Sequence, residues 1–597
     1  MDSILYGNNI EIKENKGISD YFEEYAKLYS DEIALKFISQ EFNFKTLNSL
    51  SNKFSHYLLK YGIDRNSQIG VCFNRCPELI ISIISILKIG CICVPIDIRS
   101  SDDAKNSILN NNKINYVISS KFLNIVGDCD NIICDLNFSF PYHEIDANIN
   151  IEKNINDVAF IFFTSGSTGK PKGVLVSNGG VLNDSLPGIA EPTLSKDDVF
   201  LMSSPIDSIR ITGEMFYPWF AGASVIILPE ENTLDVTKYI ELIVKEKISV
   251  MYVVSNILRE ILNNENVQML SSLRYIQFLG EPLNERIAHK LFDILNVKLI
   301  NVYGQTETGC CTIKYINTAA DIGDNVGTPV NNRIIYIFDE SFNLVKKGDI
   351  GEVYIGGEGL SLGYVNEFEL TEEHYIKKTL YGDKIIYKTG DIGSIINDTL
   401  KLEGRIDDMI KIGGKKVNFR EIRGIILDLE EVEDASLHRI THNENYNYIV
   451  AFIVIKDINS ISKLEINNYL KDKLPNYKLP SFYLIKSEIP RLPNGKLNKA
   501  LINQMIESEI SEKNQCEEFP GTLNEILEII EDVLKTDKNE INILYTFMEL
   551  GGDSINLASV VLKIEDKFDL EIPYELIVGL SILEISKFVE GEQMCDN

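Results

Sequence analysis

The sequence has few basic residues for its length. Its 597 residues include 58 Lys and Arg against 88 Asp and Glu, which gives a formal net charge of −30. A surface of that sign repels phosphate backbones and argues against nucleic acid as a partner. The segment from Cys516 to Asn597 holds 19 acidic residues against 5 lysines and no arginine. The negative charge is therefore concentrated in a small C-terminal piece of the chain.

Long apolar runs and targeting patterns are absent. No stretch of about 18 uninterrupted apolar residues occurs, which is the length that a transmembrane helix requires. The first residues, MDSILYGNNIEIKEN, do not combine a basic start with an apolar stretch, as a signal peptide does. We therefore expect a cytoplasmic protein that has no membrane partner.

Metal-binding cysteine patterns are absent too. The ten cysteines are scattered and form no CxxC pair, which the common zinc sites require. Thiols stay reduced in the cytoplasm, and most of these cysteines are expected to pack in the interior.

Apolar segments of two kinds are abundant. Hydrophobic residues make up 44% of the sequence, and a chain of this length is expected to divide into three or four domains. Up to about residue 400, runs typical of strands alternate with amphipathic runs, which predicts parallel sheets covered by helices. The predicted strands are QIGVCF, CICVPI, VAFIFF, SVIIL, SVMYVV, YIQFLG and KLINVYG, and the predicted helices include ELIISIISILKIG and TKYIELIVKEK.

The segment FTSGSTGKPKGV, residues 163–174, directly follows the predicted strand VAFIFF. Glycine, serine and proline, which recur in this segment, also form ordinary surface turns. Glycines, however, allow several backbone N–H groups to point inward together, and the hydroxyls and lysines add donors, so the loop suits a polyphosphate. It is not the GxxxxGK[ST] loop, because Gly166 and Gly169 are too close and Pro171 follows Lys170. We predict a phosphate-binding loop of another class.

Six further segments follow this loop in a fixed order. They are NVYGQTETG (301–309), GEVYIGGEGLSLGY (351–364), YKTGD (387–391), GRIDDMIKIGGKKV (404–417), LPNYKLP (474–480) and NGKLNK (494–499). Together they resemble the adenylate-forming superfamily, specifically the amino-acid adenylation domains of nonribosomal peptide synthetases, over about residues 15–505. The resemblance implies an ATP-dependent enzyme that joins a carboxylate to the α-phosphate of ATP and releases pyrophosphate.

The resemblance also implies an ATP site. Tyr303 would stack on adenine, Asp391 would accept the ribose hydroxyls, and Arg405 would lie near the ribose and the phosphate. The implied ATP-binding residues are Thr164, Ser165, Gly166, Ser167, Thr168, Gly169, Lys170, Lys172, Tyr303, Gly304, Asp391 and Arg405.

Three residues are implied to be catalytic: Lys496, Thr306 and Glu307. Charge builds on the phosphoryl oxygens during adenylation, so fixed positive donors such as the Lys496 ammonium should contribute most. Thr306 would contact the α-phosphate. Glu307 would bind Mg²⁺, a hard cation that prefers carboxylate oxygen. Asp407 matches the hinge about which the family's small domain rotates.

The implied substrate pocket departs from the family pattern. At the position where the family has an aspartate that pairs with the α-amino group, this sequence has Ile209, and Asp207 lies two residues earlier. Asp207 would suit an amine displaced from the α-carbon, as in a β-amino acid; alternatively the substrate is an aryl or other acid whose amine is not bound. The implied substrate-binding residues are Asp207, Arg210, Gly213, Tyr252, Gln277, Leu279, Gly280, Val302, Cys310 and Cys311.

The size of that pocket can also be anticipated. Gly213 is expected to add depth, while Tyr252 and Leu279 are expected to narrow the side. Gln305 stands where the family usually has proline, and the resemblance gives it no role.

The acidic C-terminal piece resembles a peptidyl carrier domain. It contains FMELGGDSINLASVVLKIEDKF, in which Ser554 precedes an amphipathic helix, the place expected for 4′-phosphopantetheine attachment by a phosphopantetheinyl transferase. A serine that only caps the helix is the alternative. In TLNEILEIIEDVLK, a helical face is predicted at Leu523, Ile526, Leu527, Ile530 and Leu534.

The expected fold class is an α/β large N-terminal domain (1–403), a smaller α+β domain (404–507), a linker (508–520) and an all-α four-helix carrier domain (521–593). We expect an ATP-dependent ligase that loads an amino acid, β-amino acids included, or else an aryl acid, onto its own carrier domain. No HHxxxDG or GxSxG motif occurs, so a downstream enzyme acting in trans is expected to take the product. The rival functions are an acyl-CoA ligase, which the fused carrier disfavours, and a non-catalytic acyl-binding protein.

Overall fold

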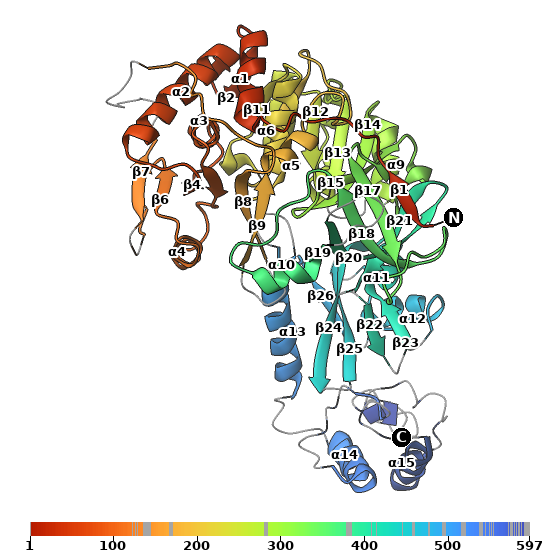
Figure 1. Cartoon of the computed structure of the whole chain (residues 1–597). Helices are drawn as coiled ribbons and strands as arrows, with labels where there is room; N and C mark the ends of the chain where they lie inside the picture. Colours follow the sequence, from red (N-terminus) through yellow and green to blue (C-terminus); the bar gives the residue numbers. More distant parts are fainter. Residues whose placement is uncertain are drawn as a thin grey trace. The chain divides into compact units, whose positions relative to one another are not determined.

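The computed structural model describes the chain except for residues 1, 122, 126, 128, 135–144, 166–170, 234, 280–284, 378–384, 407–408, 413–414, 444–445, 457–459, 476–477, 481, 492–496, 515–520, 537–540, 542, 544, 548–549, 551, 553, 571, 573–576, 578–579, 581, 583–584, 587 and 590–597. The chain forms two compact units (Figure 1). Unit 1 comprises residues 1–407 and 493–495, and unit 2 comprises residues 408–492 and 496–597.

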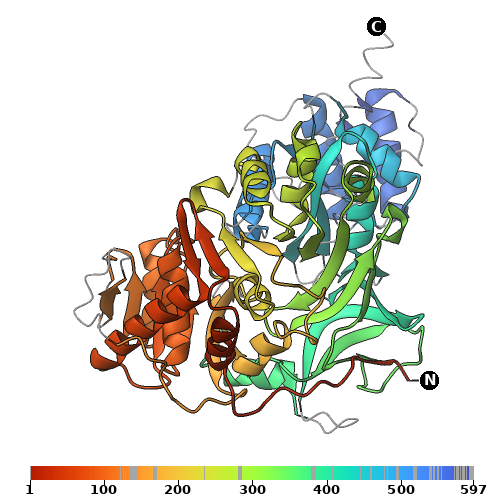
Figure 2. The same cartoon turned by 90° about the horizontal axis from the view of Figure 1, so that it is seen from above.

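Unit 1 contains a six-stranded sheet, drawn mainly in shades of orange in Figure 2. Its strands lie in the order β7 (Asp130–Ile133), β6 (Tyr116–Ser119), β4 (Gln68–Cys72), β5 (Ile92–Pro95), β8 (Val158–Ser165) and β9 (Pro171–Ser177). All pairs are parallel except β8 with β9. Because β8 and β9 pair directly, the predicted phosphate loop joins two neighbouring antiparallel strands.

A second sheet of 15 strands fills the rest of unit 1. Its parallel part is β2 (Ile33–Phe37), β11 (Ser224–Ile227), β10 (Val199–Met202), β12 (Val250–Val253), β13 (Tyr275–Leu279) and β14 (Lys298–Gln305). An antiparallel part continues through β15 (Gly309–Ile316), β16 (Asn325–Pro329), β21 (Thr399–Arg405), β20 (Ile386–Ile396), β18 (Gly351–Gly357), β17 (Arg333–Phe338) and β1 (Ile4–Tyr6), while β3 (Gln40–Asn43) and β19 (Tyr375–Ile376) pair with β2 and β20. The parallel strands confirm the predicted alternation, whereas the antiparallel part was not predicted.

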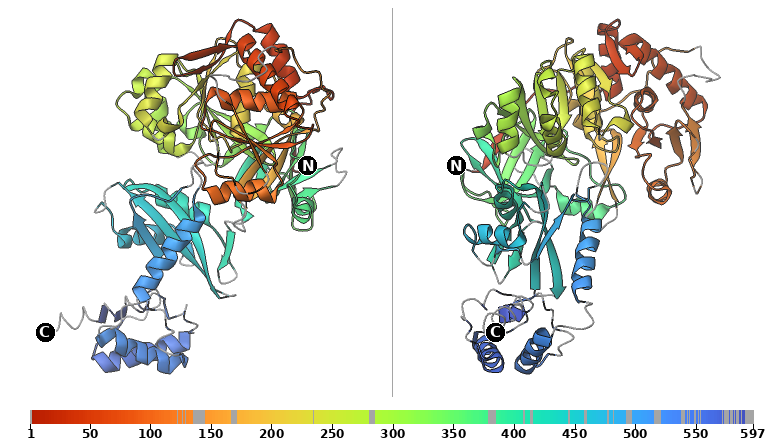
Figure 3. Two further views of the ribbon diagram at one scale, coloured as in Figure 1. Left: turned by 90° about the vertical axis from the view of Figure 1, so that its left-hand side faces the viewer. Right: turned by 180° about the vertical axis from the view of Figure 1, so that it is seen from behind.

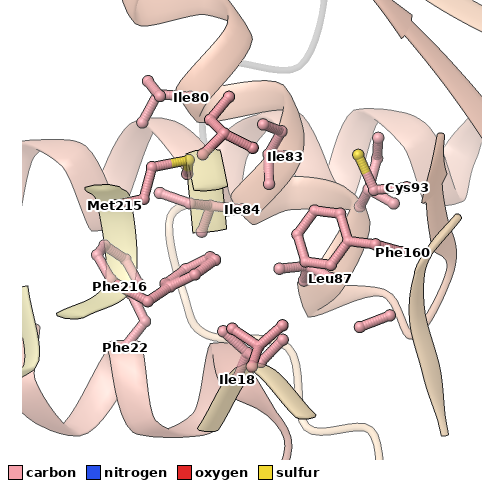
Figure 4. Close-up of a cluster of buried hydrophobic side chains, with 14 of the residues drawn as sticks. Ile18, Phe22, Ile80, Ile83, Ile84, Leu87, Cys93, Phe160, Met215 and Phe216 are labelled. Atoms are coloured by element: carbon pink, nitrogen blue, oxygen red, sulfur yellow. The ribbon is translucent and has the colours of Figure 1, made fainter. Parts of the chain in front are cut away.

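Helices that pack against the two sheets of unit 1 share one hydrophobic core. Figure 4 shows side chains of α1 (Ile18–Leu28), α3 (Pro77–Lys88) and α6 (Arg210–Phe220) meeting β5 and β8. The helix α3 is buried over almost its whole length, as its run ELIISIISILK predicts for a helix that is apolar on every side. The helices α7 (Val236–Glu246), α8 (Ser255–Asn263) and α9 (Glu285–Ile294) form a separate core against the parallel strands.

Unit 2 opens with a hairpin, β22 (Met409–Ile412) and β23 (Lys415–Asn418), and a three-stranded sheet, β24 (Val432–Asn443), β25 (Tyr446–Ile455) and β26 (Phe482–Lys486). The central strand β25 is apolar on both faces. Its odd-numbered residues from 449 to 455 pack with α11 (Phe419–Leu427) and α12 (Lys463–Lys471), and its residues 450, 452 and 454 pack with α13 (Lys499–Asn514). Helix α13 extends into 508–514, so the first half of the predicted linker is helical.

The last part of unit 2 has its own apolar core. Helices α14 (Gly521–Leu534) and α15 (Ser554–Phe568) lie side by side in both views of Figure 3. The predicted face of α14 is confirmed, because Leu523, Ile526, Leu527 and Ile530 are buried in this core and Leu534 packs against it. In the described part of the chain, no helix combines the length and the apolar character that crossing a membrane would need.

Candidate active site

The turn between β14 and β15 carries two of the predicted catalytic residues. The strands pair in antiparallel fashion up to Gln305 and Gly309, so Thr306 and Glu307 lie at the tip of a tight connection. Gly309 has a φ of +62°, and a Cβ there would lie 2.3 Å from Oδ2 of Asp184. A side chain at position 309 would therefore be strained in its backbone and would collide with a carboxylate.

Asp391 is surrounded by donors. Its Oδ2 accepts hydrogen bonds from Tyr303 Oη at 2.6 Å and from Gln305 Nε2 at 2.8 Å, and its Oδ1 accepts one from Arg405 Nη1 at 3.2 Å. Strand register explains part of this arrangement, because Asp391 and Arg405 are direct partners on β20 and β21. Burial and the neighbouring Asp391 charge raise the pKa of Tyr303 well above its ordinary value, so its hydroxyl remains a donor. Three predicted ATP-binding side chains thus meet at one point.

Glu307 and Lys172 both lie against Tyr364, a residue that was not among the predicted site residues. Tyr364 Oη donates to Glu307 Oε1 at 3.0 Å, and Lys172 Nζ lies 5.8 Å from the centre of the Tyr364 ring. Backbone hydrogen bonds join β9 to residues 362–365, which brings the base of the phosphate loop to this ring. The GEGLSLGY motif, which ends at Tyr364, was the available signal for this residue.

A chain of hydrogen bonds connects Asp391 to Glu307. Gln305 donates from Nε2 to Asp391 and accepts at Oε1 from Tyr387 Oη at 3.3 Å. The Tyr387 and Tyr364 hydroxyls are 3.4 Å apart, and Tyr364 donates to Glu307. Burial is the main cause that raises the pKa values of both tyrosines. Gln305, which had no role from the sequence, therefore links the two predicted sites.

A buried ion pair supports the other side of the same turn. Arg333 is fully buried and donates from Nε to the carbonyl of Cys310 at 3.1 Å and from Nη2 to the carbonyl of Thr308 at 2.6 Å. Its Nη2 lies 3.6 Å from Oδ1 of Asp184, whose Oδ2 accepts from the Cys310 N–H at 2.9 Å. The sequence offered one signal for Arg333, a lone charge at the start of the apolar strand RIIYIF.

Five of the ten predicted pocket residues share one face of the second sheet. Tyr252 is the register partner of Gln277, Leu279 is the partner of Val302, and two-residue alternation places all four on the same side. Cys310 packs with Val302 and Leu279 in one apolar cluster. Within the described residues, the buried Nε2 of Gln277 has no hydrogen-bond partner. This face therefore offers an apolar surface with one amide donor.

Two pocket expectations need correction. Cys311 packs in the core of the antiparallel strands beside Tyr303, because consecutive residues of a strand point to opposite faces, so it does not join Cys310 on the pocket face. Gly213 does not add depth either. A Cβ at Gly213 would lie 3.0 Å from the hydroxyl of Tyr252, so the tyrosine already fills that space.

A small cavity of about 10 Å³ lies beside the turn. Its lining residues are Val176, Gly180, Val181, Asp184, Ile209, Thr212, Thr306, Gly309, Gly359 and Ser361. Asp207 is not among them. The charges that act on Asp207 include those of Arg99 and Arg210. Ile209 and Thr306 are therefore brought together, and the acidic residue that accompanies them is Asp184.

Several predicted residues lie outside the described part of the chain: Gly166, Ser167, Thr168, Gly169, Lys170, Gly280, Asp407 and Lys496. Thr164 and Ser165 form the end of β8, paired with Lys172 and Pro171 of β9. Ser554 is the first residue of helix α15, where the sequence placed it.

Comparison with known proteins agrees with this geometry. Residues 22–365 match the family described as AMP-binding enzyme, residues 421–496 match its C-terminal domain, and residues 524–588 match the phosphopantetheine attachment site. The chain is 30% identical over 605 residues to bacitracin synthase 1 of Bacillus licheniformis, which covers 99% of this chain and 11% of that protein. The chain thus spans about a tenth of the length of this relative.

Solved structures share the fold. NpsA of Klebsiella oxytoca in complex with 3-hydroxyanthranilyl-AMSN aligns with a TM-score of 0.73 and 22% identity, over 82% of this chain and 99% of that one. NpsA-ThdA, an artificially fused adenylation-PCP di-domain from the same organism, aligns with a TM-score of 0.62 and 20% identity, over 97% of this chain and 99% of that one. With its family match extending over more than half of its length, the chain belongs to the AMP-binding enzyme family.

Proposed function

We propose that the chain activates a carboxylic acid with ATP and transfers the acyl group to a phosphopantetheine arm on Ser554. The observation that carries this proposal is the convergence of Tyr303, Asp391 and Arg405 next to the turn that holds Thr306 and Glu307. The phosphopantetheine attachment domain in the same chain supplies the acceptor. An amino acid, β-amino acids included, is the substrate class that we favour.

In the first step, an oxygen of the substrate carboxylate bonds to the α-phosphorus of ATP, and the bond from that phosphorus to the leaving pyrophosphate breaks. Asp391 accepts the ribose hydroxyls, and Arg405, its partner, stays beside it. Thr306 donates to the α-phosphate, and Lys172 and Lys496 hold negative oxygens as charge develops on them. Each of these groups acts by position and charge, as phosphoryl transfer requires.

The Mg²⁺ ion that the family uses fits the residues present. The described residues hold no group of three His, Cys, Asp or Glu side chains that could form a metal cage. Glu307 is a single carboxylate, held by Tyr364, and Mg²⁺ is commonly bound by one or two carboxylates together with substrate phosphates. When bound there, Mg²⁺ would neutralise charge on the phosphates.

The phosphopantetheine arm on Ser554 would supply a thiol. Its sulfur would bond to the acyl carbon of the acyl-adenylate, and the bond from that carbon to AMP would break. Ser554 is the first residue of α15, and the match to a phosphopantetheine attachment site covers residues 524–588. We therefore propose two partners, a phosphopantetheinyl transferase that modifies Ser554 and a downstream enzyme that takes the acyl group.

A second substrate class is favoured by one observation. Ile209 lines the cavity beside Thr306, which leaves that position without a charge for an α-amine. An aryl or other acid without a bound amine would suit such a position. The solved structure of NpsA holds a 3-hydroxyanthranilyl analogue, which is an aryl acid derivative.

ATP–pyrophosphate exchange over a panel of α-amino, β-amino and aryl acids tests the proposal. At least one acid should support exchange, and the holo-chain should then become acylated. Failure of the whole panel would favour the non-catalytic alternative. Faster acyl transfer to free coenzyme A than to the carrier domain would instead favour an acyl-CoA ligase.

A further inference from the structure

Asp184 is an acidic residue placed in the cavity of the candidate active site. It follows helix α5 (Asn178–Asn183) and lines the cavity together with Ile209 and Thr306. The side chain is 21% exposed, whereas its Oδ1 atom is buried. The family motifs in the sequence gave no indication of this position.

The carboxylate of Asp184 is only partly satisfied. Its Oδ2 accepts from the N–H of Cys310 at 2.9 Å. Its Oδ1 has no hydrogen-bond partner among the residues that the structure describes, and the Nη2 of Arg333 stands 3.6 Å away. That nitrogen already donates to the carbonyls of Thr308 and Gly359. Asp184 thus retains an acceptor for a further donor.

Burial raises the pKa of the Asp184 carboxyl above its ordinary value, and the Arg333 charge opposes this effect in part. The ionised form is therefore less stable here than in water. A second cation in the cavity would stabilise it, because a buried carboxylate gains most from a partner that also donates hydrogen bonds.

The cavity also suits an ammonium group in size and place. Its volume of about 10 Å³ is close to what one water-sized group requires. The substrate carboxyl must approach the α-phosphate near Thr306, so an amine one or two carbons away falls within a few ångströms of this point. Asp207, the alternative carboxylate, is not part of the cavity lining.

We propose that Asp184 binds the ammonium group of an amino-acid substrate, in the place that Ile209 leaves without a charge. This inference rests on the proposed function. Asp184 is then a specificity-determining residue that selects acids carrying an amine near the carboxyl group. The opposing interpretation gives Asp184 a purely structural role, in which it and Arg333 brace the β14–β15 turn.

The variant Asp184→Asn separates these interpretations, because its amide oxygen can still accept from Cys310 while the negative charge is lost. Pyrophosphate exchange is measured on the full chain with the best amino acid found and with its analogue that lacks the amine. Asp184→Asn should lower kcat/KM for the amino acid roughly 100-fold, because the substrate ammonium would lose its charged partner in a buried site. The same variant should change kcat/KM for the analogue less than about 3-fold. The matched control Asp207→Asn should leave the ratio of the two substrates unchanged.

Restoring a carboxylate adds a positive test. Introducing Ile209→Asp into the Asp184→Asn variant should recover at least about a tenth of the lost selectivity for the amine. If thermal unfolding shows that Asp184→Asn loses its folded state, Asp184→Ser, which keeps a hydroxyl acceptor, replaces it.

Three results would overturn the inference while leaving the proposed function intact. The first is an equal loss of kcat/KM for both substrates in Asp184→Asn, which is expected of a structural brace. The second is a change of substrate ratio in Asp207→Asn alone, which would assign the amine to Asp207. The third is a wild-type chain whose best substrates lack an amine. Absence of exchange with every acid overturns the proposed function itself.

Discussion

Gln305 donates from its Nε2 to Oδ2 of Asp391 at 2.8 Å, across 86 positions of the sequence. Asp391 is buried, and the same oxygen also accepts from Tyr303. A neutral amide that donates to a buried carboxylate fixes the orientation of that carboxylate without adding a charge. The proposed ribose contact of Asp391 therefore depends on Gln305, a residue to which no role could be assigned from the sequence.

We predict that Gln305→Leu lowers kcat/KM for ATP roughly 10- to 100-fold, because a hydrogen bond to a charged group contributes about 1.5–3 kcal/mol. The loss should fall mainly on KM for ATP, since the contact concerns binding of the ribose. Tyr387→Phe, which removes the 3.3 Å contact to Gln305 Oε1 and the 3.4 Å contact to the Tyr364 hydroxyl but leaves the bond from Gln305 to Asp391, is the matched control and should have a smaller effect. An unchanged KM for ATP in Gln305→Leu would contradict the positioning role.

Glu307 should determine the requirement for Mg²⁺. We expect Glu307→Gln to lower pyrophosphate exchange roughly 100-fold and to raise the Mg²⁺ concentration needed for half-maximal rate, because the amide is a poorer ligand for a hard cation. Tyr364→Phe keeps the carboxylate and removes the hydrogen bond to Glu307 together with the contact to Tyr387, so the rate of exchange should fall by about 10-fold. Chelation of divalent ions should abolish exchange in the wild type. A Mg²⁺ titration curve identical to that of the wild type in Glu307→Gln would exclude the metal role.

Lys496 remains a prediction from the sequence. We expect Lys496→Ala to lower adenylation roughly 100-fold or more, as the loss of a transition-state donor does. Lys499→Ala, three residues further on at the start of α13, is the matched control and should change the rate less than about 3-fold. Comparable rates for the two variants in pyrophosphate exchange would remove the catalytic role of Lys496.

Ser554 should be the site of modification. Incubation with coenzyme A and a phosphopantetheinyl transferase should add one phosphopantetheine group to the wild type and none to Ser554→Ala, as intact-protein mass spectrometry can show. Adenylation should proceed at the wild-type rate in Ser554→Ala, because only the acceptor is lost. The control Ser559→Ala, within the same helix, should be modified normally; modification of the Ser554→Ala variant would refute the assignment.

His438 should make unit 2 sensitive to acid. Burial, with a smaller effect of Lys499, lowers the pKa of His438 to about 4. Between this value and about 6.5 the unfolded chain binds a proton that the folded chain does not, so stability falls as the pH decreases through this window and is unaffected above it. The full decrease in the free energy of unfolding is on the order of 3 kcal/mol.

Hydrogen exchange of peptides from β24 and β25 at pH values from 7 to 4.5, corrected for the intrinsic rate, measures this effect. His438→Gln should weaken the dependence of the corrected exchange rates on pH, since glutamine does not titrate. Replacement of the exposed His289 by glutamine should leave this dependence unchanged. The same acid sensitivity in His438→Gln as in the wild type would assign it to other groups.

The order of the motifs and the alternation of strands and helices could be predicted from the sequence, because both are local properties. The run VAFIFF forms β8, ELIISIISILK forms α3, and Ser554 begins α15, since apolar periodicity over a few residues already determines which faces need burial. The family resemblance added predicted roles for Asp391, Arg405 and Glu307, which lie in short sequence motifs.

Only the tertiary structure decided how those residues are held. Asp184 reaches the Cys310 N–H across 126 positions, and Arg333 contacts the same turn from another strand, so no local pattern could pair them. The choice of Cys310 rather than Cys311 for the pocket face, the filling of the space at Gly213 by Tyr252, and the link from Gln305 through Tyr387 to Tyr364 likewise depend on how the strands and helices pack. Register is fixed by the packing of whole sheets, and for that reason the specificity of the pocket could not be predicted from the sequence alone.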